Sequence, residues 1–280
     1  MFEIINKKEL NPTVSKIDVY APLIAKKAKP GQFVILRVAT DGERIPLTIA
    51  NSDIEQGLIT LIFQIVGATT YQLNQLKEND CLCDLVGPLG RASELDNIEK
   101  AIVIGGGVGS AIAFPLVKAL HEKGKKVITI LGFRNKDLVI LEEEFKKYSD
   151  ELYIMTDDGS YQEKGLVTDK LKAIISIDTT IDHVFAIGPL IMMKYVAITT
   201  KPYQIKTTVS MNPIMIDGTG MCGGCRVLVN NEMKFACVDG PDFDGHTVDF
   251  DDAIARASFY RDFEKHRYEE SCNLFSKELG

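Results

Sequence analysis

The 280-residue sequence predicts an α/β protein of three parts: a small antiparallel β-barrel, a doubly wound parallel α/β sheet, and a short cysteine-bearing segment. Three observations predict this class. Short strand patterns fill residues 1–97, buried strands alternate with helix patterns over residues 98–206, and three cysteines share a glycine-rich stretch within residues 207–280. A chain of this length has room for two or three domains, each with its own core.

The first part has the pattern of a barrel. Residues 14–20 alternate between apolar and polar side chains, as a half-buried strand does, and residues 33–38 and 58–66 are apolar, β-branched runs. Residues 69–76 suit a short helix. Many short strands separated by glycine and proline turns are typical of a small barrel.

The second part alternates strands with helices, which implies a parallel sheet with a ligand crevice at the carboxyl ends of its strands. The loops at Gly105, Thr156 and Gly188 would line that crevice. The expected strands are residues 101–105, 127–133, 152–156 and 183–188, and the expected helices are residues 110–123, 138–148 and 167–175.

Charge and hydropathy exclude two classes of partner. The net charge of −7 argues against a nucleic-acid binder, which needs a basic face. No apolar run reaches the ~20 residues that span a bilayer. The first eight residues are amphipathic and include Glu3, unlike a secretion signal. We therefore expect a cytoplasmic protein that binds neither nucleic acid nor membrane.

A glycine-rich turn at residues 105–109 lies directly between a buried strand and a helix pattern. Glycines let the backbone approach a pyrophosphate, and a helix N-terminus offers free N–H groups. Because Ser110 occupies the last position of Gly-x-Gly-x-x-Gly, a plain tight turn stays an alternative. A second loop, at the end of the fourth strand, faces the same crevice, with a simple strand stop as its alternative. The candidate nucleotide-binding residues are Gly106, Gly107, Val108, Gly109, Gly188 and Pro189.

The sequence leaves the choice between NADH and NADPH open. The second strand of the sheet ends at Arg134 and lacks the acidic residue that would bind a ribose 2′-hydroxyl. Arg134 could accept a 2′-phosphate or lie on the surface. The turn therefore predicts a dinucleotide site without naming the dinucleotide.

Residues 215–227 form the most specific stretch of the chain. Cys222 and Cys225 make a Cys-x-x-Cys unit, and Cys237 can return to the same place after an apparent hairpin at residues 227–235. Six cysteines are too sparse for a disulfide scaffold, so a tight trio indicates metal ligation. The surrounding glycines free the backbone to curl around a cluster and point N–H groups at its sulfurs.

A binuclear iron–sulfur cluster needs four ligands, and the cysteine trio supplies three. Asp217 lies five residues before Cys222, at the place of the first cysteine in the plant-type Cys-x4-Cys-x2-Cys spacing. We therefore expect Asp217, Cys222, Cys225 and Cys237 to hold a [2Fe-2S] cluster. The alternative is a structural zinc ion completed by Asp217 or His246.

The remaining cysteines and histidines suggest no further site. Cys81 and Cys83 alternate along a strand and so point to opposite faces, one toward the core and one toward the surface. Cys272 is expected to be a free thiol, and no histidine is expected to act as a catalytic acid or base. The aromatic residues within 250–274 predict either a docking helix for a partner or a helix packed on the sheet.

In this order, the three parts resemble the ferredoxin reductase-like flavoproteins. Among them the chain looks most like the small subunits of NADH-dependent reduced ferredoxin:NADP oxidoreductases, the electron-bifurcating transhydrogenases. It is also similar to the electron-transfer subunit of dihydroorotate dehydrogenase. The resemblance covers about residues 1–265 and is most specific in the cysteine segment. It implies an FAD-binding barrel, an NAD(H)-binding α/β domain and a [2Fe-2S] segment, as in ferredoxin–NADP reductases.

The resemblance also implies where FAD binds. The family motif Arg-x-Tyr/Phe-Ser/Thr appears at residues 43–49, although its arginine sits one place early. The next strand matches a second flavin-contact segment, and residues 67–70 match a pyrophosphate turn that opens a helix. Without the resemblance these residues indicate only a barrel. The implied FAD-binding residues are Arg44, Pro46, Leu47, Thr48, Ile62, Phe63, Gln64, Thr69 and Thr70.

Asp217 separates the two groups of relatives. The dihydroorotate dehydrogenase subunits carry cysteine at this position, whereas the transhydrogenase subunits carry aspartate. The resemblance thus implies a heterodimer with a larger subunit that bears FAD and [4Fe-4S] clusters and handles ferredoxin, while this chain meets NADH. Two alternatives stay open: the electron-transfer subunit of an NAD-linked dihydroorotate dehydrogenase, and a non-catalytic zinc-binding scaffold.

Overall fold

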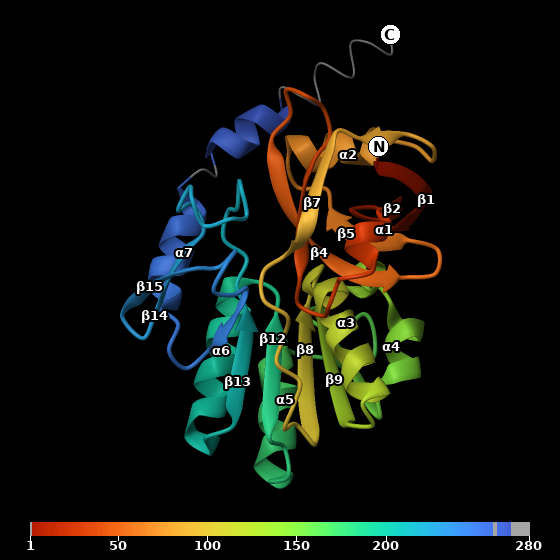
Figure 1. Ribbon diagram of the computed structural model, residues 1–280. Coiled ribbons are helices and arrows are strands. Elements are labelled where there is room, and N and C mark those ends of the chain that lie inside the picture. Colours follow the sequence, from red (N-terminus) through yellow and green to blue (C-terminus); the bar gives the residue numbers. More distant parts are fainter. Residues whose placement is uncertain (1, 260–261, 270–280) are drawn as a thin grey trace.

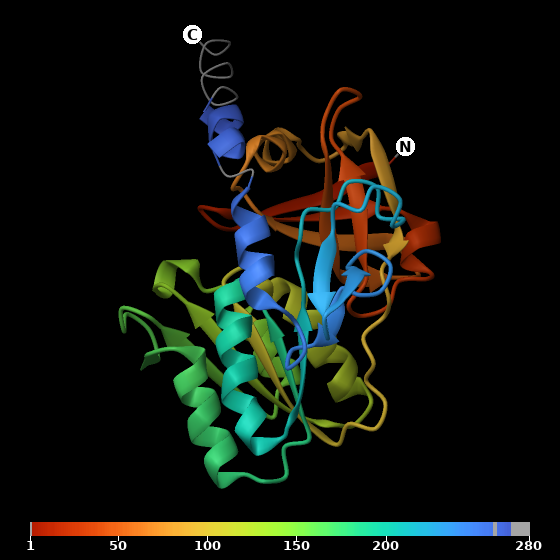
Figure 2. The same cartoon turned by 90° about the vertical axis from the view of Figure 1, so that its left-hand side faces the viewer.

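The computed structural model describes residues 2–259 and 262–269. It has two lobes, a barrel and an α/β lobe, with the cysteine-bearing segment running along one side of both (Figure 1). The same segment lies in front of the two lobes when the molecule is turned by 90° (Figure 2).

The first lobe is a seven-stranded antiparallel sheet with the strand order β6-β1-β2-β5-β4-β3-β7. Its two edge strands, β6 and β7, are separated only by Cys83, whose N–H donates to the carbonyl of Arg37 on β3. The sheet therefore curls back on itself, which confirms the predicted barrel. Its elements are β1 (Phe2–Asn11), β2 (Val14–Tyr20), α1 (Pro22–Ala25), β3 (Phe33–Arg37), β4 (Arg44–Asp53), β5 (Leu58–Gln64), α2 (Ala68–Gln75), β6 (Cys81–Leu82) and β7 (Asp84–Leu89).

The barrel core follows from the period-two patterns of its strands. Along β2, Ile17 and Val19 are fully buried, and along β5 the buried side chains that face them are Ile59, Leu61 and Phe63. Successive side chains of a strand point to opposite faces, so the alternate residues lie outside this core.

The second lobe is a sheet with the order β11-β10-β9-β8-β12-β13-β16, parallel except for β16. The order reverses between β8 and β12, which makes their carboxyl ends the switch point of a doubly wound sheet. The predicted α/β fold is confirmed, and β13 and β16 join it from later in the chain. Its elements are β8 (Lys100–Gly106), α3 (Gly109–Glu122), β9 (Lys126–Phe133), η1 (Lys136–Leu138), α4 (Glu142–Tyr148), β10 (Glu151–Thr156), β11 (Glu163–Lys164), α5 (Val167–Ile177), β12 (His183–Ile187), α6 (Leu190–Thr200), η2 (Lys201–Tyr203), β13 (Lys206–Ser210) and β16 (Asp242–Asp244).

Helices cover both faces of this sheet. On β8, Val103 packs in one core with α3 and α4, whereas Ile102 and Ile104 pack in the other core with α5 and α6. Because both faces are covered, the strand is apolar throughout and does not alternate. The continuous apolar run that predicted a buried strand has this origin.

The remaining segment contributes the hairpin of β14 (Arg226–Val229) and β15 (Glu232–Phe235), then α7 (Phe250–Ser258) and helical residues 262–269. Asn230 and Asn231 form the hairpin turn, both with positive φ. The predicted hairpin is therefore present. In the part of the chain that the structure describes, no helix is long and apolar enough to cross a membrane.

Candidate functional site

The hairpin brings two of the predicted cysteines together. Cys225 directly precedes β14, and Cys237 is the second residue after β15. The N–H of Ala236 donates to the carbonyl of Cys225 (3.0 Å). Both side chains are buried, and their Sγ atoms lie 3.2 Å apart. Burial, and then the neighbouring Cys225 thiol, raise the pKa of Cys237 to about 12. The two thiols form a buried pair, and a bound metal would replace their protons.

Asp217 organises the loop that leads to the first predicted cysteine. Its Oδ1 accepts from the backbone N–H of Thr219 (2.6 Å), and its Oδ2 accepts from that of Cys222 (2.8 Å). These bonds, first the one from Thr219, hold the pKa of Asp217 below its ordinary value. The carboxylate of Asp217 thus accepts hydrogen bonds from the backbone at two points of the loop, Thr219 and Cys222. The side chain of Cys222, at the end of that loop, is exposed.

The four predicted ligands are brought together only in part. Over residues 2–259 and 262–269, no group of three or more His, Cys, Asp or Glu side chains is arranged to hold a metal ion. Two thiolates on one tetrahedral metal, each about 2.3 Å from it, lie about 3.8 Å apart, so the Cys225–Cys237 pair needs only a small opening. Cys222 and Asp217 would have to turn inward, and the loop carries both on one short segment. The residue types fit a cluster with three thiolates and one carboxylate.

Two loops are in close contact at the place where the nucleotide crevice is predicted. A Cβ atom on Gly109, at the start of α3, would lie 2.5 Å from the carbonyl oxygen of Ile187, and one on Gly106 would lie 3.0 Å from Cδ of Pro189. The N–H of Gly107 donates to the carbonyl of Gly132 on β9 (2.8 Å). The structure therefore gathers the six predicted residues at the switch point between β8 and β12, at the N-terminus of α3.

One residue beside this crevice was not predicted. A Cβ atom on Gly106 would lie 2.5 Å from Sδ of Met192, in the first turn of α6. Its signal in the sequence was its position four residues after Gly188, on the helix that opens from the second crevice loop.

The predicted flavin residues lie on β4, β5 and the start of α2. Phe63 is buried in the barrel core and Ile62 packs on the opposite face against the α/β lobe, so these two reach a ligand only through their backbone. Thr70 Oγ1 accepts from the N–H of Gly67 (3.0 Å), which closes the turn before α2. Thr69 Oγ1 donates to Glu43 Oε2 (3.3 Å).

Other predicted flavin residues lie toward the barrel surface. Arg44 is exposed at the start of β4, and Thr48 pairs with Phe33 of β3 and is half-buried. β4 also contacts α3 directly, where Lys118 Nζ donates to Asn51 Oδ1 (3.0 Å). The flavin strand and the helix of the nucleotide loop are thus packed against each other. Pro46, Leu47 and Gln64 are also half-buried.

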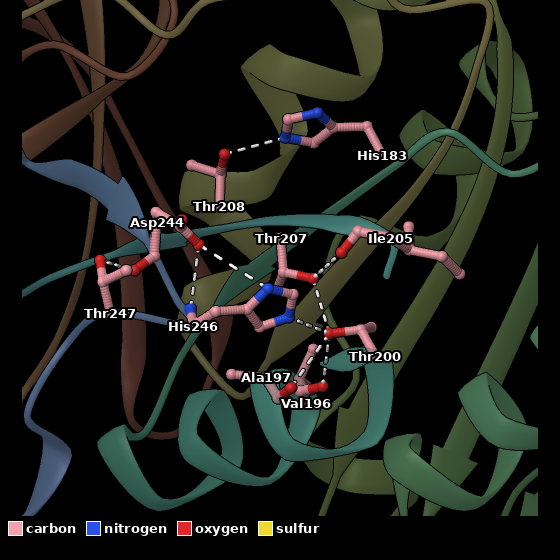
Figure 3. Close-up of polar contacts among 10 residues, drawn as sticks. All are labelled: His183, Val196, Ala197, Thr200, Ile205, Thr207, Thr208, Asp244, His246 and Thr247. Carbon is pink, nitrogen blue, oxygen red and sulfur yellow. Dashed lines mark hydrogen bonds and ion pairs between the residues drawn. The ribbon is translucent and has the colours of Figure 1, made fainter. Parts of the chain in front are cut away.

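Two histidines have hydrogen-bond partners within the α/β lobe. His246 Nε2 lies 2.9 Å from Thr200 Oγ1, which also accepts from Thr207 Oγ1 (2.6 Å), in the network of Figure 3. His183 Nε2 lies 2.8 Å from Thr208 Oγ1, and burial lowers the pKa of His183 to about 4. His246 therefore joins α6 to the turn that follows β16.

A cavity of about 520 Å³ lies at the amino ends of β12 and β13, opposite the predicted crevice, and His183 lines it. Neither predicted site opens into it. Of the other cysteines, Cys81 is exposed and Cys83 is half-buried, whereas Cys272 lies outside the described residues.

Comparison with known proteins places these features in a family. Residues 212–249 match the model of the iron-sulfur cluster binding domain of dihydroorotate dehydrogenase B. A Thermotoga maritima homolog of the electron transfer subunit of dihydroorotate dehydrogenase B (NAD(+)) is 45% identical, over 95% of this chain and 94% of that protein. The Streptococcus pneumoniae electron transfer subunit is 34% identical, over 88% of this chain and 99% of its own length.

A solved structure is similar over nearly the whole chain. It belongs to work on flavin-based electron bifurcation by the NADH-dependent reduced ferredoxin-NADP oxidoreductase. The match has a TM-score of 0.91 and 44% identity, and it covers 96% of this chain and 97% of the other. Barrel, α/β lobe and cysteine segment are therefore shared as one arrangement.

Proposed function

The chain belongs to the family of dihydroorotate dehydrogenase B electron-transfer subunits and their homologues, and from this premise we propose the role of each site. The protein is an oxidoreductase subunit that moves electrons between NAD(H) and a partner subunit, with FAD and a [2Fe-2S] cluster as its cofactors. The observation that carries this function is the cysteine segment, matched as an iron-sulfur domain within a chain that aligns from end to end. The complex we propose is a bifurcating NADH-dependent reduced ferredoxin:NADP+ oxidoreductase.

At the nucleotide end, the backbone does the binding. The N-terminus of α3 directs N–H groups and the positive end of its dipole at a pyrophosphate. Gly188 and Pro189 form the other wall, because Gly106 packs directly against them. These residues orient NAD(H) at the carboxyl edge of the sheet, and β4 lies beside them on α3.

At the flavin end, the chain supplies a strand and a helix start. Thr48 and the backbone of β4 and β5 would contact the flavin ring, and the start of α2 would hold the pyrophosphate at Thr69 and Thr70. Arg44, exposed at the start of β4, is free to reach a phosphate. When bound, FAD converts the two-electron chemistry of a nicotinamide into single-electron transfer, and the protein positions and tunes it.

At the cluster end, Cys225 and Cys237 would hold the buried side of the [2Fe-2S] cluster, and Cys222 and Asp217 its exposed side. The backbone N–H groups that now bond to Asp217 raise the population of its carboxylate form, the form that ligates iron. A carboxylate in place of a thiolate alters the potential of the cluster.

The partner is a larger catalytic subunit, as the electron-transfer subunits of this family imply by name. We propose that it carries FAD and [4Fe-4S] clusters and that ferredoxin acts through it. Exposed apolar side chains surround the cluster loop, with Met221 90% exposed and Ile216 51% exposed, as expected of a surface that a partner covers.

The second candidate is the electron-transfer subunit of an NAD-linked dihydroorotate dehydrogenase. It is favoured by the relatives and by the family model that matches residues 212–249. Asp217 argues for the bifurcating enzyme, because the sequence resemblance assigns aspartate to its small subunits and cysteine to the dihydroorotate dehydrogenase subunits.

Purification of the native complex tests both candidates. The bifurcating enzyme predicts a co-purified larger subunit with flavin and [4Fe-4S] clusters. A flavin-bearing partner without cubane clusters would favour dihydroorotate dehydrogenase instead. A chain that carries neither flavin nor iron would contradict both.

A further inference from the structure

The C-terminal helical residues 262–269 leave the α/β lobe and lie beside α2 of the barrel, as Figures 1 and 2 both show. The contact is aromatic: the rings of Tyr268 and Tyr71 have centroids 6.0 Å apart and meet at 84°, edge to face. Within residues 262–269, Tyr268 alone is not exposed. Tyr268 is therefore a residue by which this helix meets the barrel.

The contact lies at a specific place on α2. Tyr71 is four residues beyond Gly67, the residue before the helix, and its N–H donates to the carbonyl of Gly67 (2.9 Å). Four residues of helix span about 6 Å, roughly the reach of a ribose between a phosphate and its base. An adenosine attached to a pyrophosphate at the start of α2 would therefore be within reach of Tyr71.

The helix pair that carries Tyr268 is anchored at its other end. Phe250, at the start of α7, is buried in the α/β core, and Asp251 Oδ1 accepts from Lys194 Nζ of α6 (2.6 Å). α6 begins directly after the second crevice loop. The segment thus reaches from α6, which follows the second crevice loop, to α2, where Tyr268 meets Tyr71.

We propose that Tyr268 and Tyr71 form an aromatic clamp for the adenine ring of FAD, so that the C-terminal helix is part of the flavin site. Aromatic side chains bind bases through their faces, and two rings at right angles present one face and one edge to a planar ligand. The clamp rests on the proposed function, because it requires FAD on the barrel. It adds a binding role for a segment that the sequence left between docking and packing.

The clamp differs from plain helix packing in one measurable respect. FMN has the isoalloxazine ring and one phosphate but no adenosine. A clamp on adenine must therefore discriminate FAD from FMN, whereas a packing contact affects both flavins alike.

The test measures the affinities of the deflavinated full-length chain for FAD and for FMN by flavin fluorescence. Tyr268→Ala is expected to weaken the affinity for FAD about tenfold, because one aromatic–base stack is lost, and to leave the affinity for FMN unchanged. Tyr71→Ala has the same expected effect. Tyr268→Phe keeps the ring and keeps the FAD affinity.

Two further variants serve as a control and as a substitute for an alanine variant that fails to fold. Phe263→Ala removes an aromatic side chain that is 75% exposed on the same helical segment, and it is expected to bind both flavins normally. Tyr268→Leu keeps apolar packing without an aromatic face, so it serves if the alanine variant unfolds, and it is expected to lose FAD selectively.

Equal weakening of FAD and FMN, or an unchanged FAD affinity in Tyr268→Ala and Tyr268→Leu, would overturn the clamp. If the wild-type chain binds FAD and the variants bind it with the same affinity, the clamp is wrong and the proposed function stands. A wild-type chain that binds no flavin sinks the proposed function, and the clamp with it.

Discussion

Two glycine-rich loops dominate the sequence, and they use glycine for different reasons. In the nucleotide loop, Gly109 has ordinary φ, but a Cβ atom there would lie 2.5 Å from a backbone oxygen, that of Ile187. In the cysteine loop, Gly220 has φ +85°, and its nearest neighbour is a side-chain carbon, Cγ2 of Val238 at 2.7 Å. The first loop needs a small residue because two rigid elements touch, and the second needs glycine for its backbone conformation.

The difference separates a preformed site from one completed by its ligand. The nucleotide loop is held between β8, β12 and α3, all of them buried. The cluster loop is exposed at Cys222 and is held by the hydrogen bonds to Asp217. Metal binding supplies folding free energy to sites of the second kind. We therefore expect damage in one loop to leave the other intact.

The largest expected effect is on the cluster. Cys237→Ser removes a buried thiolate ligand and should abolish the [2Fe-2S] cluster, measured as iron and acid-labile sulfide per chain, while NADH still binds. Cys83→Ser is the matched control, a half-buried cysteine outside the trio that should keep the cluster. Loss of NADH binding in Cys237→Ser would show that the two loops are not independent.

The next largest effect is expected from acid, which should lower the stability of the α/β lobe that carries the nucleotide loop. Burial lowers the pKa of His183 to about 4, despite nearby Asp182 and Asp244, with Lys206 assisting. The unfolded state therefore binds the proton first, and stability is lost as pH falls from 6.5 toward 4. Protonation of His183 in the unfolded state lowers the free energy of unfolding by about 3 kcal/mol once the pH is below 4, and by about 2 kcal/mol at pH 5.

His183→Gln should remove this part of the pH dependence. Urea unfolding of the wild type and the variant at pH 7 and pH 5, followed by circular dichroism, measures it. The same loss of stability in both chains would refute the assignment to His183.

Gly109→Ala tests the close contact of the nucleotide loop. The added Cβ meets backbone atoms that cannot rotate away, so we expect the free energy of unfolding to fall by about 1–3 kcal/mol. We also expect NADH binding, measured by calorimetric titration, to be at least tenfold weaker. Gly107→Ala is the control, because its Cβ would meet nothing within 4 Å and only its positive φ is strained. Gly107→Ala should be milder, and the reverse order would contradict the contact argument.

The smallest effect is expected at Gly220→Ala. A left-handed backbone costs an alanine about 1 kcal/mol, and Val238 can yield because it is a side chain. The cluster should be lost to a chelator several-fold faster, with NADH affinity unchanged. A change in NADH binding without a change in cluster loss would contradict the assignment of Gly220 to the cluster loop.

The parts of the fold that local pattern decides could be predicted from the sequence. The strand–turn–helix around residues 101–123 and the hairpin that joins Cys225 to Cys237 depend on neighbouring residues, and both are present. β13 and β16 could not be assigned to the sheet in this way, because their pairing depends on contacts distant in the chain.

The site could be predicted in composition more than in orientation. Motif matching placed Phe63 among the flavin contacts, but its side chain points into the barrel core, since the motif carries no information on the facing of each residue. Nor did spacing reveal that Asp217 is engaged by two backbone N–H groups. The Tyr268–Tyr71 contact joins residues that are 197 positions apart in the chain, and no local pattern encodes it.

Anaerobic titration of the purified full-length chain with NADH shows whether electrons pass from NADH through the flavin to the cluster. Absorption follows the flavin and electron paramagnetic resonance follows the cluster. We expect NADH to bleach the flavin and to produce the signal of a reduced [2Fe-2S] cluster, and we expect this signal to shift in Asp217→Cys. A chain without flavin, or one whose flavin is reduced while no cluster signal can be produced even by dithionite, would contradict this expectation.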